Sequence, residues 1–364
     1  MKNIKYKSIG LLLSISFSLC FFIGSSQQNK LAKAEKDKPI GTLEIVAEMD
    51  INPGNVAVSK EGRVFSTIHP MRPNMTKLVE ITSKTTYVPF PSEKLQPKTA
   101  SASDDTFDTP QGLIFDNQNR LWVLDAGFSI GRTRLYAFDI DSKKELMRFN
   151  IPKELAPSNS FVQDLAVDDK NGFVYLACVT NPGIIVVDIN KNEFRKIIDL
   201  PTMQSEDADM VIDGKVQYLN GEPARIALDP ITISADKETL YYGAMNGTKW
   251  YQLPTKNIRN GATDAVIIKQ ISVLADKPFS DGADTDEHGN HYFTNIQNYS
   301  IDVLSKDGKL SVLKKDPLLD WPDSVRIQGD WLYIAASQVH KTPAFANGKE
   351  LSDGLFRVLK LKFK

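Results

Sequence analysis

Cysteine and histidine are scarce in this sequence, which has 2 cysteines and 4 histidines among 364 residues. So few cysteines exclude a disulfide-rich scaffold, and the isolated positions of His69 and His340 argue against a zinc site built on histidines. Neither sign of charge dominates, since the formal net charge is −1, so no basic face for nucleic acid is expected. Long amphipathic helical patterns are also nearly absent, which excludes the helical fold classes.

Residues 1–34 differ in kind from the rest of the chain. Lysines at positions 2, 5 and 7 precede an apolar run over residues 9–24, and Ala32-Lys33-Ala34 has the small-x-small form of a cleavage site. This pattern predicts a secretory signal peptide over residues 1–34, with residues 35–364 exported to the periplasm or the extracellular space. A membrane anchor is less favoured because the run is short and contains serines, so no stable membrane span is expected after cleavage.

The cysteines fit this interpretation. Leu19 precedes Cys20 where a lipidation site would need a small residue, so Cys20 is not expected to carry a lipid. Cys178 would be the single cysteine of the mature chain, which rules out an intramolecular disulfide and favours a small buried side chain,.

A repeated phrase organises the remaining residues. Each copy has a polar or glycine pair, a short apolar strand, a turn of Asp, Gly, Asn or Lys, and a second strand rich in aromatic residues. The copies are about 50 residues apart, a period typical of propellers. The opening pairs are Gly54-Asn55, Gln111-Gly112, Gln163-Asp164, Asp229-Pro230, Asp281-Gly282 and Asp323-Ser324.

Six copies predict an all-β fold, a six-bladed β-propeller of four-stranded antiparallel blades that occupies residues 35–364 as one domain. A ring of blades must close, because an open blade edge would expose unpaired backbone groups. LEIVAEM near residue 43 and GLFRVLKL near residue 354 are the natural pair to share one blade. The polar stretch over residues 91–109 is expected to be a long surface loop.

Particular phrases carry a family resemblance: LWVLDAG at 121–127, FVQDLAVDD at 161–169, GIIVVDI at 183–189 and WPDSVRI at 321–327. Together with FSTIHPMRPNMTKLVEI in the first blade, they resemble the Yellow and major royal jelly protein family in an exported bacterial form. The resemblance implies a six-bladed propeller related to the SMP-30 and gluconolactonase-like lactonases. It does not fix the function, since one fold hosts many chemistries.

Residues at the start of the innermost strands should ring one mouth of the central channel. Asp, Asn and Gln side chains from separate blades would converge there, and such oxygen donors suit Ca²⁺, another divalent cation or a polar ligand. Local satisfaction of backbone N–H groups is the competing interpretation for any single residue. The candidate ligand-binding residues are Asn55, Gln111, Gln163, Asp164, Arg225, Asp281 and Asp323, and the candidate metal ligands are Asp164, Asp281 and Asp323.

The resemblance to the lactonases is incomplete at this site. Asp281-Gly282 matches the late Asp-Gly pair that holds metal in those enzymes, whereas Gly54-Asn55 stands where they have a glutamate. Arg225 stands where a ligand asparagine is expected, and an arginine cannot ligate a cation. We therefore expect Arg225 near the channel to favour an anionic group and to weaken the case for a lactonase.

The resemblance also implies binding of small biogenic amines, for which carboxylates and aromatic faces would be needed. The aromatic candidates are Phe128, Tyr292, Phe293 and Tyr299, although packing between blades is the more common use of such residues.

Two matches to known sequence motifs are not interpreted as functional sites. Residues 127–131 fit G-x-S-x-G around Ser129, but a strand follows where the serine-hydrolase elbow requires a helix. Residues 284–291 resemble a calcium loop, but Asn295 occupies the position of the required glutamate, so a hairpin turn is predicted there.

Two functions of different class remain. One is a secreted propeller that binds a small polar or aromatic ligand at the channel mouth. The other is a divalent-metal-dependent enzyme of lactonase or tautomerase type that uses the same site.

Overall fold

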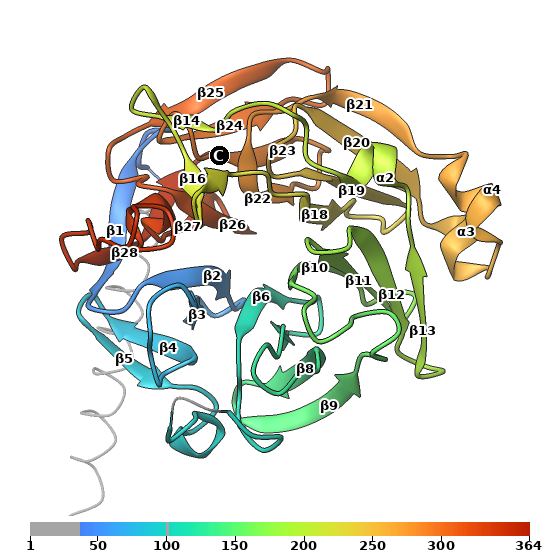
Figure 1. The fold of residues 1–364 in the computed structure, drawn as a ribbon, viewed down its shortest axis with the longest axis horizontal. Coiled ribbons are helices and arrows are strands. Elements are labelled where there is room, and N and C mark those ends of the chain that lie inside the picture. Colours follow the sequence, from blue (N-terminus) through green and yellow to red (C-terminus); the bar gives the residue numbers. More distant parts are fainter. Residues whose placement is uncertain (1–36, 100–101) are drawn as a thin grey trace, which may run out of the picture.

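The computed structural model describes residues 37–99 and 102–364, and the predicted signal peptide lies outside this range. Within the described residues, six four-stranded antiparallel sheets surround a central channel, as predicted (Figure 1). Each sheet is one blade, and in five of the six blades the strands follow one another along the chain from the channel outwards.

The strands of blades 1 to 3 are, in order, β2 (Pro53–Val58), β3 (Val64–Ile68), β4 (Leu78–Ser83) and β5 (Thr86–Pro89); β6 (Pro110–Phe115), β7 (Arg120–Asp125), β8 (Arg134–Asp139) and β9 (Lys144–Asn150); and β10 (Val162–Asp168), β11 (Phe173–Cys178), β12 (Gly183–Asp188) and β13 (Glu193–Ile197). The strands of blades 4 to 6 are β18 (Leu228–Ile233), β19 (Thr239–Ala244), β20 (Lys249–Pro254) and β21 (Ser272–Asp276); β22 (Ser280–Thr285), β23 (His291–Asn295), β24 (Ser300–Leu304) and β25 (Leu310–Lys315); and β26 (Pro322–Gln328), β27 (Trp331–Ala336), β28 (Phe356–Lys362) and β1 (Leu43–Met49).

Blade 6 closes the ring with strands from both ends of the chain. β1 is its outermost strand and pairs antiparallel with β28, in a register that sets Leu43 opposite Leu361 and Met49 opposite Phe356. The predicted closure is therefore confirmed. It covers the edge that β28 would otherwise expose.

The core is divided among the interfaces between blades. Each neighbouring pair of blades encloses its own cluster of buried apolar side chains. Phe293 packs edge-on against Trp250 between blades 4 and 5, and Tyr292 lies in the cluster between blades 5 and 6. Both aromatic residues are therefore used in packing, as the simpler interpretation predicted.

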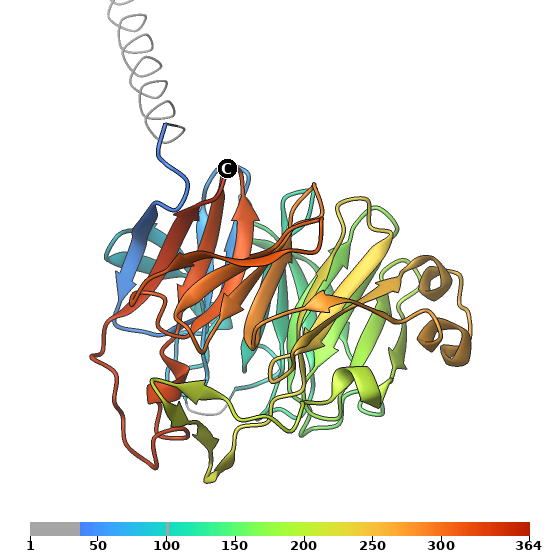
Figure 2. The same cartoon turned by 90° about the horizontal axis from the view of Figure 1, so that it is seen from above.

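Loops on one face of the ring are long, and Figure 2 shows them below the blades, opposite the C-terminus. Two small hairpins extend there between blades 3 and 4, and short helical turns occupy several connections. These elements are β14 (Val211–Ile212), β15 (Lys215–Val216), β16 (Tyr218–Leu219), β17 (Glu222–Pro223), α2 (Leu200–Met203), α3 (Lys256–Arg259), α4 (Asp264–Ile268), η1 (Glu93–Leu95) and η2 (Val339–Lys341). No helix among the described residues is long and apolar enough to cross a membrane.

The predicted loop over residues 91–109 is only partly a surface feature. Its Phe107 is fully buried among the aromatic residues between blades 1 and 2. Arg134 anchors the loop by donating hydrogen bonds to the carbonyls of Asp104 and Thr106. Composition alone missed this anchoring because one aromatic side chain and backbone carbonyls supply it.

The segments around Ser129 and over residues 284–291 have the local structure that was predicted for them. Ser129 lies in the connection between β7 and β8, where its hydroxyl donates to Asp108 at 2.7 Å and no helix follows. Residues 286–290 form the turn between β22 and β23. Cys178 is a buried free thiol, and burial raises its pKa.

Leu359 tests the closing blade, because this fully buried side chain lies on β28 between β1 and β27. Leu359→Ala should lower the free energy of unfolding by about 2–5 kcal/mol through lost apolar burial and a cavity. Urea denaturation measures the change. Leu351→Ala is the matched control because that leucine is 59% exposed, and equal effects of the two substitutions would contradict the assigned packing.

Candidate functional site

Every inner strand is irregular at the residues that open the repeat. The register of each inner strand against its neighbour shifts between Pro53 and Val56, Pro110 and Leu113, Val162 and Asp164, Leu228 and Ile231, Ser280 and Ala283, and Pro322 and Ser324. A β-bulge re-aims side chains and often marks functional positions. Six bulges at equivalent positions gather the opening pairs at one end of the channel.

Glycines allow these strands to approach closely. A Cβ atom on Gly112 would lie 2.7 Å from the carbonyl oxygen of Gln163, and one on Gly282 would lie 2.6 Å from that of Asp323. Any larger residue would clash with the backbone of the next blade. The glycine of these opening pairs is thus a packing requirement of a narrow ring.

The Asn, Gln and Asp residues of the opening pairs are all buried, with 6% exposure or less, and we call them the mouth ring: Asn55, Gln111, Gln163, Asp164, Asp229, Asp281 and Asp323. Four of these side chains are carboxylates from four different blades. A buried carboxylate must be paired, hydrogen-bonded or protonated, so the partner of each one determines what the ring can bind.

Asp281 has partners on both oxygens. The Gln163 amide donates to Oδ1 at 3.0 Å and the Trp321 indole N–H donates to Oδ2 at 2.6 Å. Trp321 holds this position with a φ of 51°, a left-handed conformation that costs of order 1–3 kcal/mol for a bulky residue. The backbone is thus held in an unfavourable conformation at the residue that contacts Asp281.

Asp164 is paired with an arginine that the sequence interpretation did not select. Arg326 on β26 is 5% exposed and donates to Asp164 Oδ1 at 2.6 Å. The same guanidinium donates to the carbonyls of Leu113 and Ala283, at 3.1 and 3.3 Å. Arg326 therefore joins blades 2, 3, 5 and 6 across the channel.

Within the described chain, Asp229 lacks such partners on both oxygens, and Asp323 lacks one on Oδ2. Among the described residues, neither oxygen of the buried Asp229 carboxylate accepts a hydrogen bond, nor does Asp323 Oδ2. Asn55 Oδ1 and Gln111 Nε2 are likewise buried without a hydrogen-bond partner in the described chain. Such atoms are rare in folded proteins, and here they are gathered in one ring.

The electrostatics agree with the geometry. Burial, and then the neighbouring carboxylates Asp281, Asp164 and Asp323, raise the pKa of Asp229 well above its ordinary value. Burial, and then Asp281, do the same for the pKa of Asp323, and burial raises the pKa of Asp281 to about 7. The mouth ring therefore favours an added proton or another positive charge.

Among the described residues, two nearby basic side chains donate no hydrogen bond to a carboxylate of the ring. Burial lowers the pKa of His69 to about 3, and its Nε2 lies 3.8 Å from Asp323 Oδ2, too far for a hydrogen bond,. Burial lowers the pKa of Lys277 to about 7, and its ammonium donates to the carbonyls of Gly247 and Pro278. The charge of Lys277 lowers the pKa of Asp229, but this effect is smaller than those of burial and the neighbouring carboxylates.

Arg225 lies outside the mouth ring. Its guanidinium is directed to Asp207 and Asp209, at 3.1 and 2.8 Å, in the connection that carries the two hairpins. The expected arginine at the channel is Arg326 instead. Arg225 was expected near the channel because of its position in the repeat, but the two hairpins lengthen the connection before β18 that carries it.

The predicted metal ligands are only partly available. Within residues 37–99 and 102–364, no three His, Cys, Asp or Glu side chains are arranged to hold a metal ion. Asp281 uses both oxygens and Asp164 one oxygen in the contacts above, whereas Asp323 keeps a free oxygen. Asp229, which was not among the predicted metal ligands, has both oxygens free.

An apolar cluster lies beside the ring on the loop face. It joins the hairpin segment to the connection after β27, through Met210, Ile212, Trp321, Val339 and Phe345 among others. His340 stacks on Trp321 with ring centroids 5.8 Å apart. Tyr299 contacts His340 edge-on and donates to Asp213, whereas Phe128 packs on Phe161.

Sequence reasoning missed three features of the ring: Arg326, Trp321 and the unpartnered carboxylate of Asp229. The signal for Arg326 was an arginine in the apolar phrase SVRI, where a charge inside an inner strand needs a buried partner,. Nothing local in the sequence pairs Trp321 with Asp281, since the two belong to neighbouring blades.

Six closed blades with a polar ring at one channel mouth define a β-propeller with a candidate ligand site. Residues 109–362 match the family described as major royal jelly protein, so the chain belongs to that family. No curated protein matches the chain.

Several solved structures share the fold. Virginiamycin B lyase from Staphylococcus aureus superposes with a TM-score of 0.53 at 13% identity, over 89% of this chain and 99% of that one. A luciferin-regenerating enzyme gives 0.52 at 12% identity, over 88% and 95% of the two chains. A Bacteroides thetaiotaomicron protein of unknown function gives 0.54 at 12%, over 88% and 75%. At such identities the likeness shows the fold alone.

Replacing Arg326 tests how much its ion pair with Asp164 contributes to the free energy of unfolding. Arg326→Met leaves Asp164 buried without its cation, which should cost about 3–5 kcal/mol of unfolding free energy, and adding Asp164→Asn should restore much of the loss. Arg225→Met, which breaks a partly exposed pair, should cost under about 1 kcal/mol. Chemical denaturation of the four proteins tests this, and no recovery in the double variant would contradict the assigned pairing.

Asp229 should make stability depend on pH. Its raised pKa means that the folded protein binds more protons than the unfolded chain between the two pKa values, so stability is lost as pH rises through the folded pKa,. Asp229→Asn should therefore stabilise the ligand-free protein by about 1–3 kcal/mol at pH 8, and by clearly less at pH 4.5. Denaturation at both pH values measures the difference.

The exposed Asp307→Asn controls for removal of a carboxylate. An effect of Asp229→Asn that is equal at the two pH values would contradict the unpaired state of Asp229.

Proposed function

We propose that this chain is a binding propeller that captures a small cationic ligand, an organic amine, at the mouth ring. The observation that carries the proposal is the Asp229 carboxylate, which is fully buried and accepts no hydrogen bond from the described residues. An ammonium group has three N–H donors and a positive charge, and both are what this carboxylate lacks.

The neighbouring atoms support the same ligand. Asp323 Oδ2 and Asn55 Oδ1 are further buried acceptors without donors in the described chain. Among the described residues, Arg326 is the one guanidinium that forms an ion pair with a ring carboxylate, Asp164, so the four carboxylates outnumber it. A bound cation would offset this excess in a medium of low dielectric, where charge interactions are strong.

The family resemblance points in the same direction, because it implies binders of small amines. The enzymes among the structural relatives contribute no argument on substrate, since their likeness to this chain extends to the fold alone. We therefore assign capture of the ligand and no reaction.

A divalent-metal-dependent enzyme of lactonase or tautomerase type is the second candidate. The free oxygens of Asp229 and Asp323 favour it, because Ca²⁺ takes six to eight oxygen ligands,. The hydrogen bonds that occupy Asp281, and the ion pair that occupies Asp164, favour the amine over the metal.

We also propose that the protein acts after export. Support comes from residues 1–34, whose lysines, apolar run and Ala32-Lys33-Ala34 fit a signal peptide,.

Calorimetric titration with three molecules of similar shape tests the amine proposal: 2-phenylethylamine, 2-phenylethanol and phenylacetate. We expect saturable binding of the amine, at least tenfold tighter than that of the alcohol, and still weaker binding of the carboxylate. Asp229→Asn should weaken amine binding at least tenfold, which is 1.4 kcal/mol or more. Asp307→Asn should leave it unchanged.

Thermal denaturation with calcium or with a chelator separates the two candidates. A ligand that binds only the folded state raises the melting temperature by mass action. A rise with the amine and none with calcium supports the proposal. A rise with calcium that is lost in Asp229→Asn, without an amine effect, would replace it by the metal site.

A further inference from the structure

The channel continues beyond Arg326 into a second space. A cavity of about 520 Å³ lies between the later halves of the inner strands, and its lining includes Arg326 and the C-terminal Lys364. It therefore opens on the face opposite the long loops, where Figure 2 shows the C-terminus. Its volume is in the range of about 300–1,000 Å³ typical of small-molecule sites.

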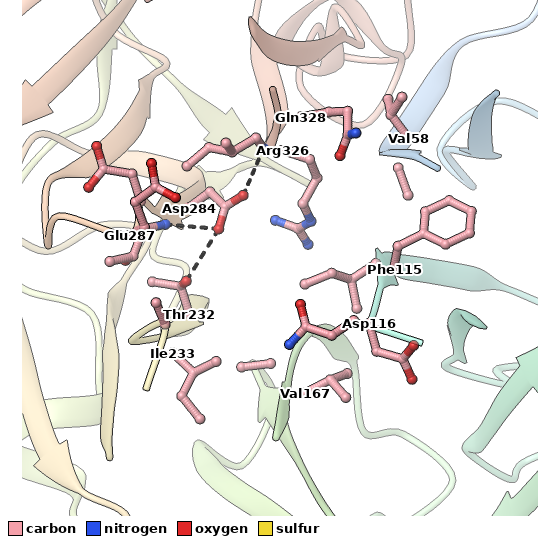
Figure 3. Close-up of a pocket in the computed structure, with 18 of the residues that line it drawn as sticks. Val58, Phe115, Asp116, Val167, Thr232, Ile233, Asp284, Glu287, Arg326 and Gln328 are labelled. Atoms are coloured by element: carbon pink, nitrogen blue, oxygen red, sulfur yellow. Dashed lines mark hydrogen bonds between the residues drawn. The ribbon is translucent and has the colours of Figure 1, made fainter. Parts of the chain in front are cut away.

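Arg326 separates this cavity from the mouth ring. Its side chain is held between carbonyls of blades 2, 5 and 6 and Asp164 of blade 3. Figure 3 shows its guanidinium directed to the middle of the cavity view, with side chains of the inner strands around it. The two spaces are therefore distinct, and what binds one need not bind the other.

Apolar and polar side chains both line the cavity. Val58, Phe115, Val167, Ile233 and Ile327 line it, each from a different blade, and polar side chains lie among them. Burial of apolar ligand surface against the apolar side chains is favourable. The apolar part of the lining therefore suits a hydrocarbon body, and the polar part suits a group that forms hydrogen bonds.

Charges at the cavity are already compensated. Arg326 lies between Asp164, which it contacts, and Asp284, whose pKa it lowers against the larger effect of burial. The two oxygens of Asp284 accept the backbone N–H groups of Thr285 and Ile327, both at 2.8 Å.

At the rim, five further charged side chains of the lining are in four ion pairs: Lys364 with Glu287, Asp330 with Lys362, Lys237 with Asp169 and Asp116 with Arg120. Two more, Lys60 and Asp286, carry opposite charges and are held by hydrogen bonds, Lys60 to the carbonyl of Asn117 and Asp286 from Asn290. In the middle of the cavity a carboxylate ligand would meet Asp284, and an ammonium ligand would meet Arg326. Both of these groups are already compensated.

Neutral hydrogen-bonding capacity remains. Arg326 has five N–H donors, and four hydrogen bonds use them within the described chain,. The half-buried Gln328 lines the cavity, and its amide makes no side-chain hydrogen bond to the described residues. The Thr232 hydroxyl has only a 3.5 Å contact with Asp284.

We propose that this cavity is a second binding site, independent of the mouth ring, for an uncharged amphipathic molecule. The ligand has an aromatic or aliphatic body for the apolar walls and a hydroxyl or carbonyl for Arg326 and Gln328. The channel thus holds two sites of different electrostatic character, one for a cation and one for an uncharged molecule, with Arg326 between them.

Fluorescence titration with a naphthalene series tests this site: 2-(1-naphthyl)ethanol, 2-(1-naphthyl)ethylamine and 1-naphthylacetate. The Asp229→Asn protein is used so that amine capture at the mouth ring does not contribute. We expect saturable binding of the alcohol with one site per chain, and at least fivefold weaker binding of the amine and the carboxylate.

Gln328→Trp should fill the cavity mouth and weaken binding of the alcohol at least tenfold. Val312→Trp places the same side chain on the outer strand β25 at a position 59% exposed, and should change binding less than twofold. Melting temperatures and near-ultraviolet circular dichroism confirm that both variants are folded.

Three results would overturn the proposal: no saturable binding of the alcohol, binding that Gln328→Trp leaves unchanged, or equal or tighter binding of the carboxylate or the amine. If the unmodified protein does not bind the amine, that result contradicts the proposal for the mouth ring and leaves the proposal for the cavity unaffected. The outcomes for the two sites are therefore distinguishable.

Discussion

The ion pair between Arg326 and Asp164 is the contact on which the centre of this propeller depends. It joins strands of blades 3 and 6, and the same guanidinium reaches carbonyls of blades 2 and 5. A buried cation is expensive unless all its donors are used, and here the backbone of the inner strands supplies most of the acceptors. The positions of the inner strands, set by blade packing, thus determine whether the pair can exist. The pair lies between the mouth ring, to which Asp164 belongs, and the cavity, which Arg326 lines.

The channel has a different environment on each side of this pair. On the loop face, four carboxylates share one guanidinium, and Asp229 is left without a donor in the described chain. On the opposite face, the same guanidinium is balanced by Asp164 and Asp284. The difference arises because Asp229, Asp281 and Asp323 open three successive inner strands, whereas the later positions of those strands mix apolar residues with Asp284 and Arg326, which carry opposite charges. Charge selectivity along the channel is therefore a consequence of position within the repeat.

The sequence allowed the fold to be predicted more fully than the site. Alternating apolar residues and turn residues recur in every blade, so the six blades and the closing pair of β1 with β28 could be predicted from local patterns. The mouth ring could be predicted for the same reason, since its members open equivalent strands. Which carboxylate has a partner could not, because Trp321 reaches Asp281 from the next blade and Arg326 reaches Asp164 across the channel. Arg225 was expected near the channel, but two hairpins lengthen the connection that carries it, and its guanidinium pairs with Asp209.

The opening pairs combine two requirements that compete for the same positions. Gly112 and Gly282 are needed because a Cβ there would strike the backbone of the next blade, so only one residue of such a pair can carry a functional side chain. That residue is Gln111 in blade 2 and Asp281 in blade 5, and a bulge turns each toward the channel,. The opening pair of blade 4 has no glycine. There Asp229 is followed by a proline, which has no N–H to donate to the ladder,. The ring is therefore narrow because of its glycines and acidic because of the residues that remain, and a narrow acidic ring is the arrangement in which an unpaired carboxylate most needs a cation.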